Sequence, residues 1–115
     1  MKLDVQDLRA LGKEALDQFE ERVGRAEPGS CFAFDLEVAR LESQLIQLYG
    51  VAAILARREE SMEGVAALWG AMIGACDAVA ARLLNLMVEH PACSASHDKI
   101  LDLRNRCARL RDLHR

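Results

Sequence analysis

GVAALWGAMIGACDAVAARLLNLMVE, residues 64–89, is the stretch that decides the fold. It carries few charges and holds the chain's single tryptophan, Trp69. At about 100° per residue, its large side chains fall on one arc and its small ones on the opposite arc. A helix that is apolar around much of its circumference is typical of the centre of a helical protein, so we expect this segment to be the central helix. The large arc comprises Val65, Leu68, Trp69, Met72, Ile73, Val79, Leu83, Leu84, Leu86 and Met87.

The segments on either side have amphipathic patterns that suit packing against this helix. In residues 32–58, apolar residues recur at alternating spacings of four and three, a heptad pattern typical of helices that pack side by side. Apolar stripes in residues 4–26 and 96–114 predict two further helices. Because the connections are short, neighbouring helices should be antiparallel. We therefore predict an all-α fold, a four-helix, mainly antiparallel up-down bundle in which residues 1–115 form a single domain.

Particular residues mark the expected helix ends. Asp4 and Ser61 suit N-cap positions, because their side-chain oxygens can accept hydrogen bonds from free backbone amides. Pro91 disfavours helical geometry in the residue before it, so the third helix should end near that point. Ser94 or Ser96 would cap the last helix. An alternative is that the second and third helices form one long bent helix, because no proline separates them. The expected helices are 4–26, 32–58, 63–89 and 96–114.

The apolar stripes of the four helices predict one shared core. A chain of this length can bury enough apolar surface for a single packed domain. The expected core residues are Leu8, Leu11, Phe19, Phe34, Leu41, Leu45, Leu48, Leu55, Leu68, Trp69, Met72, Ile73, Leu83, Ile100, Leu103 and Leu110.

Composition and charge restrict the class of protein. The formal net charge of −3 and the 4% aromatic content argue against nucleic-acid binding, which favours basic surfaces and stacking rings. The first residues, MKLDVQDLRALGKE, lack the apolar core of a signal peptide. Asp77 and Arg82 interrupt the central segment before it reaches the roughly 20 apolar residues that span a bilayer. We therefore expect a cytoplasmic protein with no membrane segment.

One group of side chains has the chemistry of a metal site. His90, Cys93 and His97 lie close in sequence, and imidazole and thiolate ligands can close around a tetrahedral zinc ion. In an up-down bundle the first and third connections lie at the same end, which would bring Cys31 to the same place. The alternative is that these residues occur in a polar loop by chance, since no CxxC motif supports a site. Zinc is therefore an alternative expectation, and no other cofactor is predicted.

The small arc of the central segment is the other candidate site. Gly70 and Gly74 form a GxxxG pattern that Ala78 extends by one helical turn. Small residues let two helix backbones approach closely, so this ridge would serve either packing within the bundle or self-association. Asp77 is set into the same arc. It would either pair with an arginine of the last helix or mark a site.

The chain shows no persuasive set of catalytic groups. Its long amphipathic helices instead predict a non-enzymatic, cytoplasmic protein–protein interaction module, of an adaptor, chaperone-like or regulatory kind. It would bind helical segments of a partner protein or form a homodimer, through the ridge of Gly70, Gly74, Asp77 and Ala78. The alternative is a helical bundle that binds a metal or small ligand through the His90–His97 segment.

Overall fold

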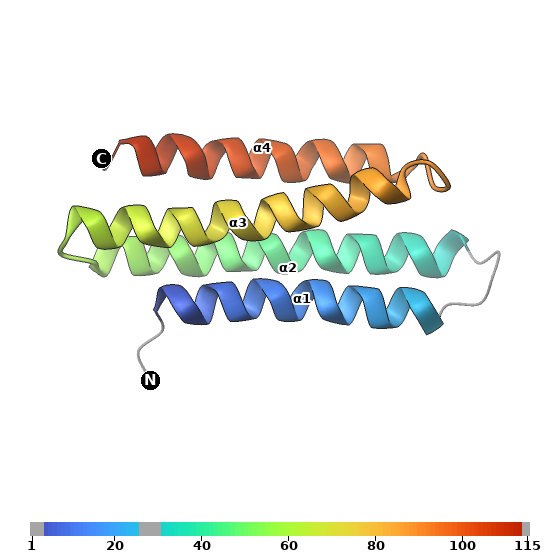
Figure 1. The fold of residues 1–115 in the computed structure, drawn as a ribbon, viewed down its shortest axis with the longest axis horizontal. Helices are drawn as coiled ribbons and strands as arrows, with labels where there is room; N and C mark the ends of the chain where they lie inside the picture. Colours follow the sequence, from blue (N-terminus) through green and yellow to red (C-terminus); the bar gives the residue numbers. More distant parts are fainter. Residues whose placement is uncertain (1–3, 26–30, 114–115) are drawn as a thin grey trace.

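The computed structural model describes residues 4–25 and 31–113, apart from the side chains of residues 31 and 32. Four α-helices occupy these ranges: α1 (Val5–Arg25), α2 (Cys31–Arg58), α3 (Met62–Leu86) and α4 (Cys93–Asp112). Successive helices run in opposite directions along the long axis (Figure 1). The described ranges contain no strand, and the predicted all-α four-helix bundle is confirmed.

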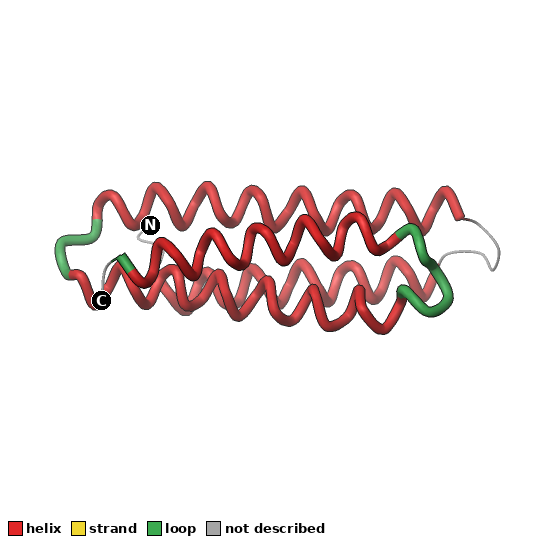
Figure 2. Tube along the Cα trace, turned by 90° about the horizontal axis from the view of Figure 1, so that it is seen from above, coloured by secondary structure: helices red, strands yellow, loops and turns green. Residues whose placement is uncertain are grey.

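The segment that decides the fold is a central helix. Both α2 and α3 pack against all three other helices, whereas α1 and α4 do not contact each other within the described ranges. The bundle is therefore flattened, with extents of 50 × 28 × 16 Å, and α1 and α4 form its two outer sides. In the view of Figure 2, α2 runs along one edge of the molecule. As a result, α2 and α3 each keep one outward face, on opposite sides of the bundle.

The core runs along the bundle, and α3 contributes more residues to it than any other helix. Leu45 from α2 is 0% exposed and Phe19 from α1 is 2% exposed, and both belong to the same buried cluster as the residues of α3. The Trp69 ring centre lies 5.5 Å from that of Tyr49 on α2. The large arc predicted for α3 is therefore mostly its core face, but the prediction is wrong for Leu84, which is 55% exposed. The buried residues of α3 are Val65, Leu68, Trp69, Ala71, Met72, Ile73, Cys76, Val79, Ala80 and Leu83.

One predicted core residue is wrong. Leu11 is 39% exposed and borders a groove between α1 and α2, next to Val51. Since α1 packs against only two helices, the bundle covers a narrower arc of it than the apolar stripe occupies. The predicted core residues Leu55, Leu103 and Leu110 are partly buried and pack against the core.

The predicted N-caps of α1 and α3 are confirmed. The Asp4 side chain accepts a hydrogen bond from the Asp7 backbone amide at 3.0 Å, and Asp7 accepts one from the Asp4 amide at 2.8 Å. This reciprocal pair satisfies two free donors at the start of α1. Ser61 Oγ accepts a hydrogen bond from the Gly64 amide at 2.9 Å. Because residues 59–61 are not helical, α2 and α3 are separate helices and the bent-helix alternative is wrong.

The connection between α3 and α4 differs from the prediction. α3 ends at Leu86, not near residue 89, and α4 begins at Cys93, not at residue 96. Turn hydrogen bonds join Cys93 N to His90 O at 3.0 Å and Ser94 N to Pro91 O at 3.1 Å. The fixed φ angle of proline suits the entry to a helix, so Pro91 leads directly into α4.

The predicted serine cap of α4 is also wrong. The N-cap position is Ala92, whose side chain cannot accept a hydrogen bond. Ser96 lies inside the helix, and its hydroxyl donates to Glu42 of α2 at 3.1 Å. The same Glu42 carboxylate pairs with Lys99 at 3.4 Å, so these side chains join α4 to α2.

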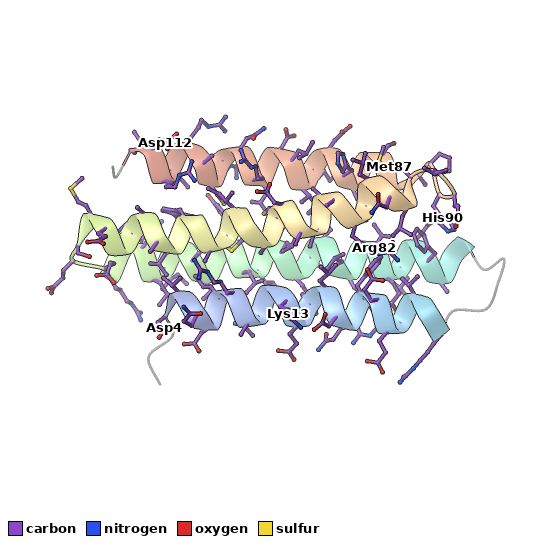
Figure 3. The ribbon with its side chains drawn as sticks, in the orientation of Figure 1. Asp4, Lys13, Arg82, Met87, His90 and Asp112 are labelled. Carbon is purple, nitrogen blue, oxygen red and sulfur yellow. The ribbon has the colours of Figure 1, made fainter. Side chains whose placement is uncertain are left out.

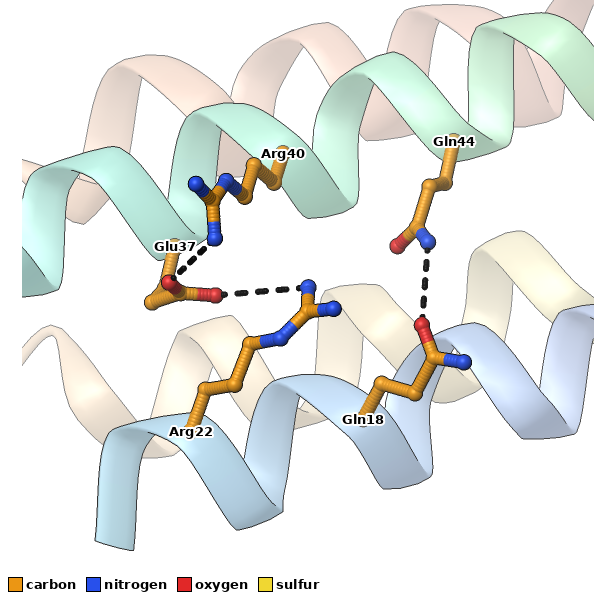
Figure 4. Close-up of polar contacts among 5 residues, drawn as sticks. All are labelled: Gln18, Arg22, Glu37, Arg40 and Gln44. Carbon is orange, nitrogen blue, oxygen red and sulfur yellow. Dashed lines mark hydrogen bonds and ion pairs between the residues drawn. The ribbon is translucent and has the colours of Figure 1, made fainter. Parts of the chain in front are cut away.

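Polar side chains also join α1 to its two neighbours. Gln44 of α2 donates to Gln18 of α1 at 3.3 Å, and Glu37 of α2 lies between Arg22 of α1 and its own neighbour Arg40 (Figure 4). On the other side of α1, Glu20 accepts hydrogen bonds from Arg82 of α3, and Figure 3 shows Arg82 directed from α3 toward α1. The Glu37 side chain is 12% exposed, but its partners Arg22 and Arg40 are 42% and 51% exposed. Ion pairs with such solvent access contribute about 0–1 kcal/mol each, so these contacts mainly set the orientation of α1.

α3 has the length and composition of a membrane span. Its most apolar window has a mean hydropathy of 1.6, and half of that window is buried inside the bundle. The core helix of a water-soluble bundle has the same properties, because its apolar residues face other helices.

Candidate functional site

Gly70 and Gly74 lie on the outward face of α3. A Cβ atom added at either position would meet no heavy atom within 4 Å. Ala78, one turn further on, is exposed. The alternative that this ridge packs closely within the bundle is therefore wrong. We call the surface formed by Gly70, Gly74, Asp77 and Ala78 the α3 small-residue face.

Close helix packing occurs instead at a glycine that the sequence analysis missed. A Cβ atom at Gly12 of α1 would lie 2.9 Å from the Cβ atom of Ala75 on α3. Gly12 is buried, between the buried residues Leu8 and Ala15. A glycine inside an apolar stripe is a signal of close backbone approach, so the sequence contained a usable indication.

A groove runs between α1 and α3 beside the small-residue face. Its volume is about 310 Å³, and Gly70, Gly74 and Ala78 line it on the α3 side. Leu16 and the basic residue Arg9 line it on the α1 side. Arg9 makes no ion pair or hydrogen bond to any described residue. The groove therefore combines an apolar floor with an unpaired positive charge on its wall.

Asp77 pairs with an arginine of the last helix, as one of the two sequence alternatives proposed. Arg104 Nε donates to Asp77 Oδ1 at 3.1 Å, and the Asp77 side chain is 53% exposed. An exposed pair of this kind contributes little to stability. It fixes a charged boundary between the small-residue face and α4.

The residues of the predicted metal site have other surroundings. The His90 ring stacks on Phe34 with ring centres 4.0 Å apart and planes at 17°, and Figure 3 shows His90 in the α3–α4 connection. Cys93 is buried, and His97 Nδ1 lies 3.9 Å from Asp98 Oδ1. Within the described ranges no three His, Cys, Asp or Glu side chains come close enough to hold a metal ion. The Cys31 side chain lies outside the description, so the four-residue site stays a prediction.

Two buried thiols sit at the α3–α4 interface. Burial, with smaller effects from Cys107 and Asp77, raises the pKa of Cys76 to about 12. Burial also raises the pKa of Cys107 to about 11. A thiol is a nucleophile and metal ligand only as the thiolate, so these two residues act as small apolar core groups.

These pKa shifts predict a loss of stability at high pH. Below pH 9 both thiols are protonated in the folded and unfolded states, so they cause no pH dependence. Above pH 9 the unfolded chain releases their protons while the folded chain keeps them up to about pH 11–12, so the unfolded state is favoured as pH rises. Urea unfolding at about pH 8 and pH 10 should show this fall. The slope should be shallower in the Cys76→Ala/Cys107→Ala variant, and an equal slope would contradict the pKa assignment.

A hollow lies at the end of the bundle where α1 begins and α2 ends. Its volume is about 930 Å³, and its lining mixes apolar residues with Asp4, Arg58, Glu59 and Glu60. Two of these carboxylates already serve the helix ends, since Asp4 caps α1 and Glu59 accepts a hydrogen bond from the Ser61 amide at 3.3 Å. These two carboxylates therefore stabilise the helix ends that border the hollow.

The α3 small-residue face and its groove are thus the candidate site, built from the small arc of the segment that decides the fold. No protein-family model matches the chain, and neither the curated proteins nor the solved structures give a match.

Proposed function

We propose that the protein is a non-enzymatic helical interaction module that binds a helix of a partner protein on the α3 small-residue face. We place it in the cytoplasm. Support for that location comes from α3, whose apolar residues are the core of the bundle and not a separate span.

The position of the two glycines is the observation that carries the proposal. Glycine in a helix interior costs about 1 kcal/mol relative to alanine, because its backbone is freer in the unfolded chain. Gly70 and Gly74 both bear this cost, and a methyl group at either position would touch nothing in the bundle. A partner helix that approaches closely supplies the missing reason, since glycines let two backbones come together.

The groove also indicates the kind of helix that fits. Its floor is apolar and shallow, so the partner helix would present small or apolar residues at intervals of three and four. The unpaired Arg9 on the α1 wall would favour an acidic residue at the edge of that helix. The Asp77–Arg104 pair bounds the face on the α4 side.

The proposal predicts that removing the glycines stabilises the isolated protein. Gly70→Ala and Gly74→Ala should each raise the free energy of unfolding by about 0.5–1 kcal/mol, because helix propensity improves without a clash. Chemical denaturation of the purified variants measures this. A loss of stability in either variant would show that the glycine serves packing within the bundle.

A substitution that fills the groove tests the proposed function. Gly74→Leu should fold normally and lose the partner in quantitative affinity capture from the native cell, because the new side chain occupies the face. Gly24→Leu is the matched control, since Gly24 is an exposed helical glycine of α1 that also has nothing within 4 Å of its Cβ position. Equal capture by wild type, Gly74→Leu and Gly24→Leu would overturn the proposed function.

A further inference from the structure

The outward face of α2 carries large apolar side chains that the bundle does not cover. Leu36, Ile46 and Ile54 are 41%, 54% and 50% exposed. No charged residue lies within this face over a length of about 27 Å at 1.5 Å per residue. Solvent-facing helix surfaces are normally rich in charge, so this one is unusual. We call it the α2 outer face; it consists of Leu36, Ala39, Ser43, Ile46, Gln47, Gly50 and Ile54.

The middle of this face also holds a glycine with no role in the bundle. A Cβ atom at Gly50 would meet nothing within 4 Å. Like the glycines of α3, it bears the cost of about 1 kcal/mol that glycine carries inside a helix. A close contact with another helix at this point would use the space that Gly50 leaves.

We propose that the α2 outer face is the interface with a second copy of this chain, with the two α2 helices antiparallel about a two-fold axis. In the register that sets Ser43 opposite the partner's Gly50, Ile54 faces the partner's Ala39 and Ile46 lies beside the axis. Ile54 then meets a small residue, and Ser43 and Gly50 let the two backbones approach closely, as ridges-into-grooves packing requires. A two-fold interface must be self-complementary in this way.

Charge is the independent observation that selects a second copy as the occupant. Asp35, near the start of α2, and Arg57, at its end, are both exposed and flank the face on the same side. Neither makes an ion pair or hydrogen bond with any described residue. In the antiparallel register Arg57 faces the partner's Leu36, one residue from the partner's Asp35, and the two-fold axis repeats this contact at the other end. The same chain therefore supplies both halves of two complementary contacts.

The expected dimer is a modest one. A standard interface takes about 800 Å² from each partner, which is about a ninth of the chain's 7194 Å² surface. The α2 outer face is one helix wide, which places the contact toward the small end of specific interfaces. The balance between monomer and dimer should therefore shift with protein concentration within the range that solution measurements cover.

Sedimentation equilibrium of the purified full chain over a concentration series tests the proposal. The mass should rise from monomer to dimer and stop there, because a two-fold interface closes. Ile46→Glu should keep the helical fold, since the residue is half exposed, and should stay monomeric. Gly24→Leu, at an exposed position of α1 with nothing within 4 Å of its Cβ position, is the matched control and should dimerise like the wild type. Because the readout is mass and not capture of a partner, this test is separate from that of the proposed function.

A charge exchange separates the interface from any effect on folding. Asp35→Arg alone and Arg57→Asp alone should each weaken dimerisation at least several-fold, because each sets like charges together across the interface. The double variant Asp35→Arg/Arg57→Asp should restore it. Neither substitution repairs the other within one chain, since the two residues lie at opposite ends of α2.

Three results would overturn the proposal. One is a monomer at all concentrations. Another is a dimer that tolerates Ile46→Glu or is not restored by the charge exchange. The third is assembly that continues beyond the dimer and is blocked by Gly74→Leu, which would indicate that α2 of one copy binds the α3 face of the next.

Discussion

Replacing Phe34 by alanine is expected to lower the free energy of unfolding by about 3–5 kcal/mol. Phe34 is 5% exposed and links three parts of the fold. Its ring centre lies 6.4 Å from that of Phe19 on α1, in an edge-to-face arrangement, and 4.0 Å from that of His90 in the α3–α4 connection. Alanine would remove both ring contacts and leave a cavity at this end of the bundle. Chemical denaturation, analysed with the same m-value for the variant and the wild type, measures the loss of unfolding free energy.

Two further variants separate the contribution of side-chain volume from that of ring stacking. Phe34→Leu keeps most of the side-chain volume. The change of shape should lower the free energy of unfolding by less than about 1.5 kcal/mol, and the loss of the ring contacts should lower it further. His90→Ala removes only the stacked ring and should cost about 0.5–1.5 kcal/mol. A double-mutant cycle of Phe34→Ala with His90→Ala should show a coupling energy of that size. Additive losses would mean that the stacking contact contributes nothing.

Gly12→Leu is the second substitution with a large expected effect. Even the first carbon of the new side chain would meet Ala75 at 2.9 Å, so α1 and α3 must move apart. Overpacking of this kind costs about 1–3 kcal/mol or more, against about 1 kcal/mol gained from helix propensity. Subtracting this gain leaves an expected net destabilisation of up to about 2 kcal/mol, or more where the two helices cannot separate, measured by thermal or urea unfolding.

Gly74→Leu is the matched comparison for this effect. It makes the same chemical change in the neighbouring helix, at a position with nothing within 4 Å. Its stability should equal or exceed that of the wild type. If the two variants were equally destabilised, the assignment of Gly12 to internal packing and Gly74 to an open face would be wrong.

The helical architecture could be predicted from residue patterns that lie within individual helices. The heptad stripe through Leu41, Leu45 and Leu48 predicted a buried face correctly, and the apolar arc of residues 64–89 did so except at the exposed Leu84. Asp4 and Ser61 predicted two helix starts, because a cap depends on local backbone geometry. Periodicity and capping act within one helix, so the sequence alone is enough to detect them.

Features that depend on how helices are arranged around one another were harder to predict. The apolar pattern of the sequence does not reveal the α2 outer face, because Ile46 and Ile54 appear only as additional apolar residues in a helix that already has a complete stripe. It could not decide whether Gly70 packs inside the bundle, because the answer depends on where α1 and α4 lie. The stacking of His90 on Phe34 joins residues far apart in the chain, so no local spacing indicates it.

Placing a photo-crosslinking residue at Ala78 tests the central claim most directly, since this exposed position lies on the small-residue face and lines its groove. The same residue at Gly24, exposed on α1, is the control. Illumination in the native cell should give a discrete adduct with a partner protein from position 78, none from position 24, and none from position 78 when Gly74→Leu is also present. Absence of an adduct from position 78, or the same adduct from position 24, would contradict the account.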